Sequence, residues 1–158
     1  MTSHARRALA LLVEPAESLP GEGAGSLPAL DVGVTGLSRG CGTSTVAHAL
    51  RRELPSARVM DGVAPGPSGV LVVVAGSAGL PVLARLVIDR LRERHPCVVL
   101  VANRPEDPEE WGRAGAVCVP QSRLGVLLLA HGRRARGPFG TALRGVARGV
   151  QLATECEL

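Results

Sequence analysis

The sequence contains no lysine and no tyrosine. All 18 basic residues are arginine, and the aromatic side chains are Trp111 and Phe139 alone, 1% of the chain. The absence of lysine excludes a catalytic lysine. RNA and single-stranded DNA are commonly bound by stacking of bases on exposed aromatic rings, so this chain lacks the side chains for that mode of binding. A net charge of +4 is too small to identify an acidic partner.

Signals for metal binding, export and membrane insertion are also missing. The four cysteines form no C-x-x-C pair, so we expect reduced thiols rather than zinc ligands or disulfides, and no haem or flavin. No apolar run reaches the ~18 residues that span a bilayer. The apolar residues 8–13 follow two arginines, but Glu14 comes next without a convincing cleavage site, so we expect no signal peptide.

The length of 158 residues suits one core domain. Residues 14–29 are rich in proline and glycine and predict a linker. We therefore expect an N-terminal segment and linker over residues 1–29, a main domain over 30–151, and a C-terminal tail over 152–158.

Strand and helix patterns alternate along the main domain and predict an α/β fold. Residues 70–75 and 97–102 are continuous apolar runs, which are typical of parallel strands buried on both faces. We therefore expect a mostly parallel sheet with helices on both faces, and a ligand site at the carboxyl ends of the strands. The remaining expected strands are 30–35, 57–60 and 116–119, and the expected helices are 44–54, 80–94, 124–134 and 139–151. In helix 80–94 the spacing of Leu83, Leu86, Val87 and Leu91 predicts the buried face.

A glycine-rich segment, GLSRGCGTST at residues 36–45, lies between an expected strand and an expected helix. A phosphate-binding loop requires this context, because backbone N–H groups and the helix N-terminus then face one anion. The hydroxyl of Ser44 or Thr45 can hold Mg²⁺. Thr43, however, occupies the position of the lysine in the motif G-x-x-x-x-G-K-[ST]. From the residues alone, a strand-to-helix turn that binds nothing remains the alternative.

The segment resembles the degenerate loop of the CpaE/TadZ group within the MinD/ParA (deviant Walker A) P-loop superfamily. Superfamily loops read G-x-K-G-G-x-G-K-[ST]-[ST]. Five positions of this chain fit that pattern: Gly36, Gly40, Gly42, Ser44 and Thr45. Ser38 and Thr43 stand where the superfamily has lysine, and Arg39 stands where it has glycine. Residues 44–48 match the S-T-x-A-H stretch of CpaE-like members.

The resemblance extends in weaker motifs to about residue 150 and implies an ATP or ADP site with Mg²⁺. Ser44 would be the Mg²⁺ ligand, and Asp61, at the end of the second strand, would position water or Mg²⁺. Asn103 and Pro120, at the ends of later strands, would lie beside the base. The nucleotide-binding residues that the resemblance implies are Gly36, Ser38, Arg39, Gly40, Cys41, Gly42, Thr43, Ser44, Thr45, Asn103 and Pro120.

Two departures from the superfamily lower the expected activity. Thr43 brings no charge to the phosphates, and phosphoryl transfer depends on positioning and electrostatics. Residues 62–68 alone separate Asp61 from the next strand, where the superfamily carries a further strand, a switch segment and more helix. We therefore expect a shortened member with little or no ATP hydrolysis. Arg39 is a candidate replacement for the lysine, and a plain surface arginine is the alternative.

By this resemblance the protein would be a cytoplasmic adaptor, nucleotide-binding or nucleotide-independent, in the localisation or assembly of a pilus or secretion system. Its partner would be a secretion or pilus ATPase or a polar scaffold, which would recruit it to the inner membrane or cell pole, and a homodimer is compatible. Three rivals stay open: an active small ATPase or kinase that uses Arg39, a ParA-like DNA-associated protein that binds through residues 133–148, and an interaction module with an empty loop.

Overall fold

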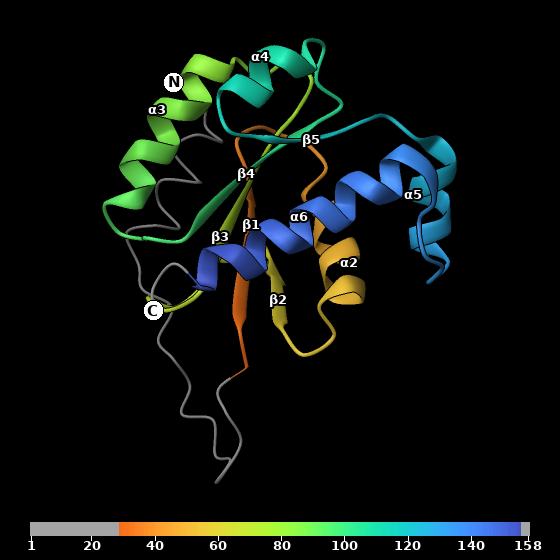
Figure 1. Ribbon diagram of the computed structural model, residues 1–158, viewed down its shortest axis with the longest axis horizontal. Helices are drawn as coiled ribbons and strands as arrows, with labels where there is room; N and C mark the ends of the chain where they lie inside the picture. The colour runs from red at the N-terminus through yellow and green to blue at the C-terminus, as the bar shows by residue number, and fades with distance from the viewer. Residues whose placement is uncertain (1–28, 156–158) are drawn as a thin grey trace, which may run out of the picture.

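Five parallel strands form one sheet in the computed structural model, which describes residues 29–155 (Figure 1). Along the sheet the strands run in the order β2-β1-β3-β4-β5. The sheet with its flanking helices confirms the predicted α/β class. The expected N-terminal segment, residues 1–29, lies outside the described residues except for its last position. The strands are β1 (Asp31–Gly36), β2 (Arg58–Asp61), β3 (Val70–Ala75), β4 (Val98–Asn103) and β5 (Val117–Val119).

Helices cover both faces of the sheet. One buried cluster joins alternate residues of the strands, such as Val72, to α2 and α6, and a second joins the other residues, such as Val73, to α3 and α4. Figure 1 shows α3 and α4 together at one side of the molecule and α5 at the other, beyond α2. The helices are α2 (Thr43–Glu53), α3 (Pro81–Arg92), α4 (Pro108–Arg113), α5 (Arg123–Ala130) and α6 (Gly137–Glu155).

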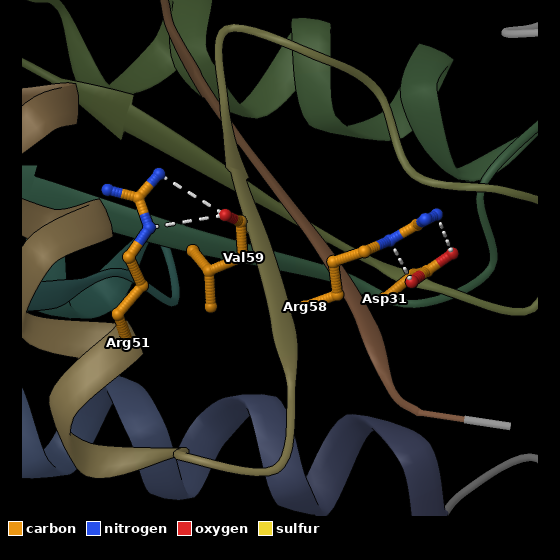
Figure 2. Close-up of polar contacts among 4 residues, drawn as sticks. All are labelled: Asp31, Arg51, Arg58 and Val59. Carbon is orange, nitrogen blue, oxygen red and sulfur yellow. Dashed lines mark hydrogen bonds and ion pairs between the residues drawn. The ribbon is translucent and has the colours of Figure 1, made fainter.

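The edge strand β2 is fixed by two arginines, as Figure 2 shows. Arg58 on β2 pairs with both carboxylate oxygens of Asp31 on β1, at 2.9 and 3.0 Å, in a register that places these two residues opposite each other. Arg51 on α2 donates to the carbonyl oxygen of Val59 at 3.2 and 3.3 Å. Because the strand has only 4 residues, these contacts support its register and thereby the position of Asp61 at its carboxyl end.

The buried face of α3 differs from the prediction. Leu91 is buried and Val87 is partly buried as expected, but Leu83 and Leu86 are 56% and 59% exposed. The residues that face the sheet are Pro81, Ala84, Ile88 and Leu91. The helix carries two apolar stripes, and the stripe with the small Ala84 is the one that contacts the sheet.

The two C-terminal helices also have different ends from those expected. The helix expected to reach residue 134 stops at Ala130, and Gly132 follows with a left-handed φ of 68°. The last helix runs to Glu155, through positions 152–155 that the sequence had suggested as tail, because the apolar spacing continues to Ala153, which is packed against the core. Of the helices within residues 29–155, none is long and apolar enough to cross a membrane.

Candidate functional site

The glycine-rich loop, residues 37–42, connects β1 to α2 at the carboxyl edge of the sheet. From β1 the chain moves to β2 on one side, whereas β3 starts the opposite half of the sheet. Ligands of open α/β sheets bind outside the strand ends at such a switch point. The loop lies over it, since Leu37 N–H bonds the Val74 carbonyl at 2.9 Å and a Cβ on Gly76 would lie 3.2 Å from the Cα of Cys41.

The loop wraps around the side chain of Cys41, which is 3% exposed. A Cβ at Gly36 would overlap the Cys41 sulfur, so only glycine allows this close approach. Gly40 and Gly42 adopt left-handed φ angles of 71° and 95°, a conformation that glycine accepts without steric cost. The thiol of Cys41 is therefore part of the buried core.

Backbone N–H groups of the loop and of the start of α2 have no hydrogen-bond partner from side chains of the described residues. No hydrogen bond among residues 29–155 engages the N–H groups of residues 38–42. Gly42 is the N-cap of α2 and provides no side-chain cap, so the first N–H groups of the helix lack a side-chain partner. Free N–H groups and the positive end of the helix dipole together favour an anion here.

Ser44 and Asp61 meet beside this loop. The Ser44 hydroxyl, in the first turn of α2, donates to Asp61 Oδ2 at 2.9 Å. The strand register places Asp61 opposite Val34 on β1, and both Ser44 and Asp61 are exposed. A hydroxyl and a carboxylate are the oxygen ligands that Mg²⁺ takes beside phosphate groups. These two residues therefore fit a Mg²⁺ ion bound together with a nucleotide.

Asn103 supports the loop from the end of β4. Its side chain is buried, with 7% exposed, and its Nδ2 donates to the Cys41 carbonyl oxygen at 2.9 Å. A Cβ on Gly42 would overlap that same Nδ2. The amide nitrogen is thus used to hold the loop, and contact of Asn103 with a base stays a prediction. Pro120 lies exposed after β5 at the same edge of the sheet.

Arg104 is the loop contact that the sequence analysis missed. Its guanidinium donates to the Gly40 carbonyl oxygen at 2.9 Å, and its backbone adopts a left-handed φ of 56°. Arg39, the candidate considered from sequence, is exposed and makes no hydrogen bond or ion pair to residues 29–155. The sequence did contain one indication of this contact, because Arg104 directly follows Asn103 at the end of an expected strand.

Two groups outside this constellation have shifted pKa values. His95 follows α3 towards the start of β4, and burial, then the charge of Arg94, lowers its pKa. Burial raises the pKa of the Cys118 thiol on β5. His48 is an exposed residue of α2. No group of three or more His, Cys, Asp or Glu within the described part of the chain is arranged to hold a metal ion.

Searches against protein-family profiles, curated proteins and solved structures found no match. The interpretation of the site therefore depends on its geometry and on the motif resemblance. The geometry brings together a loop of free N–H groups, a Ser44–Asp61 oxygen pair and the Arg104 cation. Such an arrangement can bind a phosphorylated ligand with Mg²⁺.

Proposed function

We propose that this chain binds ATP or ADP with Mg²⁺ at the loop of residues 36–45 and acts as an adaptor with little or no hydrolysis. The observation that carries the proposal is the hydrogen bond from Ser44 to Asp61 at 2.9 Å. It unites the first turn of the helix after the loop with the carboxyl end of the adjacent strand. This is the place where an ion bound to the phosphates of a nucleotide at the loop would find its oxygen ligands.

The phosphates would be held by backbone groups rather than by a lysine. The N–H groups of residues 38–42 supply neutral donors, and Arg104 supplies a permanent positive charge at Gly40. Charge-assisted hydrogen bonds are roughly twice as strong as neutral ones. The bound Mg²⁺ would supply charge neutralisation between phosphate oxygens. Ser44 and Asp61 would hold and orient that ion.

Hydrolysis is expected to be slow because the transition state receives too little charge. Thr43 takes the place of the loop lysine, and its hydroxyl adds one hydrogen bond without charge. The carbonyl of Gly40 already accepts the guanidinium of Arg104, which orients that cation along the loop. Binding with poor turnover suits a nucleotide-sensing adaptor. A role beside a secretion or pilus ATPase is the part of this proposal that the motif resemblance alone supports.

The test separates binding from turnover in the full chain. Fluorescently labelled ADP should bind saturably with Mg²⁺, at micromolar concentrations, while phosphate release from ATP stays at the level of buffer. Turnover that disappears in Arg39→Ala would instead identify the ATPase rival and contradict the adaptor. Absence of binding at millimolar nucleotide would contradict the nucleotide site and favour an interaction module with an empty loop.

A further inference from the structure

The helix α5 exposes large apolar side chains at the rim of the molecule. Leu124, Val126 and Leu127 are 67%, 42% and 55% exposed. The opposite side of the helix is fixed on the protein, since a Cβ at Gly125 would overlap the ring of Phe139 and Leu129 is packed against the core. In Figure 1, α5 lies at the outer edge beyond α2 and α6. One side of α5 is therefore packed on the protein, and its other side exposes a short apolar surface.

This part of the chain is positively charged without acidic residues to balance it. Residues 114–154, which include α5 and nearly all of α6, contain no aspartate or glutamate. The arginines of this stretch are all exposed, and they are Arg123, Arg133, Arg134, Arg136, Arg144 and Arg148. Arg123 begins α5 and Arg133 follows shortly after its end, so these two arginines flank the helix that carries the exposed leucines.

The loop after α5 is anchored on α2, and some of its arginines have no carboxylate partner among the described residues. Arg134 pairs with Glu53 of α2 at 3.7 Å, and Arg52 donates to the carbonyl oxygen of Gly132. No carboxylate of residues 29–155 lies within ion-pair distance of Arg133 or Arg136. Arg133 and Arg136 are therefore exposed cations of the loop that follows α5 and that α2 anchors.

We propose that α5 and the following loop dock on a membrane surface that contains anionic phospholipid. Exposed leucines gain free energy by entering the boundary between headgroups and acyl chains, while arginines interact with anionic headgroups and keep their charge in water. Double-stranded DNA would attract the same arginines but offers the leucines no apolar environment. The combination of both residue types in one place favours the lipid surface over nucleic acid.

The exposed stripe of α3 differs in charge and serves as the comparison. Leu83 and Leu86 are as exposed as the leucines of α5. Acidic residues accompany that stripe, however: Asp89 lies 3.9 Å from Arg92, and Glu93 lies 3.6 Å from Arg90. With four arginines against these two acids, residues 81–94 carry a net charge of +2, half of the +4 that the four arginines of residues 123–136 provide. The attraction of α3 to an anionic surface is therefore weaker. This inference does not depend on nucleotide binding, since it uses a different surface.

The test is flotation of the full chain with vesicles, without nucleotide. Binding is expected to vesicles of phosphatidylcholine mixed with phosphatidylglycerol, to weaken with added salt, and to be negligible with phosphatidylcholine alone. Replacing both Leu124 and Leu127 by serine should weaken partitioning more than ~10-fold. Arg133→Gln and Arg136→Gln should each weaken it roughly fivefold. The matched control, serine at Leu83 and Leu86, should bind like the wild type.

Several outcomes would overturn the proposal. The first is that the wild type does not bind anionic vesicles. The second is that the α5 and α3 leucine variants lose vesicle binding equally. The third is that vesicle binding depends on the arginines but not on the leucines. Salt-sensitive binding to duplex DNA together with failure to bind vesicles would assign the arginines to nucleic acid instead. Circular dichroism of each variant checks that it is folded. We expect the leucine variants to fold, because the substituted leucines are exposed.

Discussion

The guanidinium of Arg104 donates a hydrogen bond to the carbonyl oxygen of Gly40, 2.9 Å away, from a backbone with a left-handed φ of 56°. A non-glycine residue rarely adopts this conformation. Arg104 N–H also bonds the Val119 carbonyl at 2.7 Å, which holds the residue between β4 and β5. The loop thus has a cation attached to it from the end of β4, in a chain that has no lysine.

Arg104→Gln should weaken binding of ADP with Mg²⁺ roughly tenfold, because a shorter, neutral amide replaces a charged donor. Arg39→Gln is the matched control, as it removes the same charge from the exposed loop tip. Titration of fluorescent ADP measures both variants. A larger loss in the Arg39 variant would show that the cation considered from sequence, rather than Arg104, serves the phosphates.

Gly42→Ala should abolish nucleotide binding and destabilise the fold by about 1–3 kcal/mol, because the new Cβ meets the buried Asn103 amide at a left-handed φ. Gly40→Ala is the control: φ is also left-handed, but a Cβ there has nothing within 4 Å, so the cost should be about 1 kcal/mol. Urea unfolding followed by the fluorescence of Trp111 measures the difference. Equal stability of the two variants would contradict the close packing of Gly42 on Asn103.

Asp61→Asn and Ser44→Ala should each remove the dependence of nucleotide binding on Mg²⁺ while leaving weak binding in the presence of a chelator. The reason is that Ser44→Ala deletes one oxygen ligand of the proposed ion and Asp61→Asn removes the negative charge of the other, while neither variant removes a loop N–H group. Affinities with and without Mg²⁺ are compared for the wild type, both variants and the double variant. If Mg²⁺ still strengthens binding in the double variant as in the wild type, the ion lies elsewhere.

Stability should fall as the pH decreases below about 6.5, the ordinary pKa of histidine, because of His95. Burial, and secondarily Arg94, lowers the pKa of His95 in the folded protein, so the unfolded chain binds a proton at higher pH than the folded chain does. Stability from this residue is therefore intact above the unfolded pKa and is lost as the pH falls through the folded one. Thermal unfolding at pH 7.5 and 5.5 should show a smaller pH effect in His95→Gln, and an unchanged effect would contradict this origin.

The sequence predicted the elements that have strong local patterns. The continuous apolar runs of β3 and β4 and the glycine-rich turn before α2 are set by nearby residues, so the sheet class and the place of the loop followed. The meeting of Ser44 with Asp61 depends on β2 pairing with β1, which local pattern does not encode. The hydrogen bond from Arg104 to Gly40 was not predicted for the same reason, because it joins positions that are distant in sequence.

The prediction of the buried face of α3 was wrong. The helix has two apolar stripes, and hydrophobicity alone does not decide which of them packs against the sheet. Ala84 and Ile88 contact the sheet, whereas the larger Leu83 and Leu86 face outward. Size complementarity with the facing strands decides between the stripes, and that information lies in residues far along the chain. The end of α5 at Ala130 has a local cause instead: Gly132 adopts a left-handed φ of 68°, and Arg133 N–H bonds the Leu128 carbonyl at 2.7 Å.

Isothermal titration of the full chain with ADP and Mg²⁺, repeated on Gly42→Val, tests the nucleotide site most directly. We predict micromolar binding in the wild type that is lost in the variant, since the added side chain displaces the loop from Asn103. No heat of binding in the wild type at millimolar nucleotide would contradict the site, and so would binding that the variant retains.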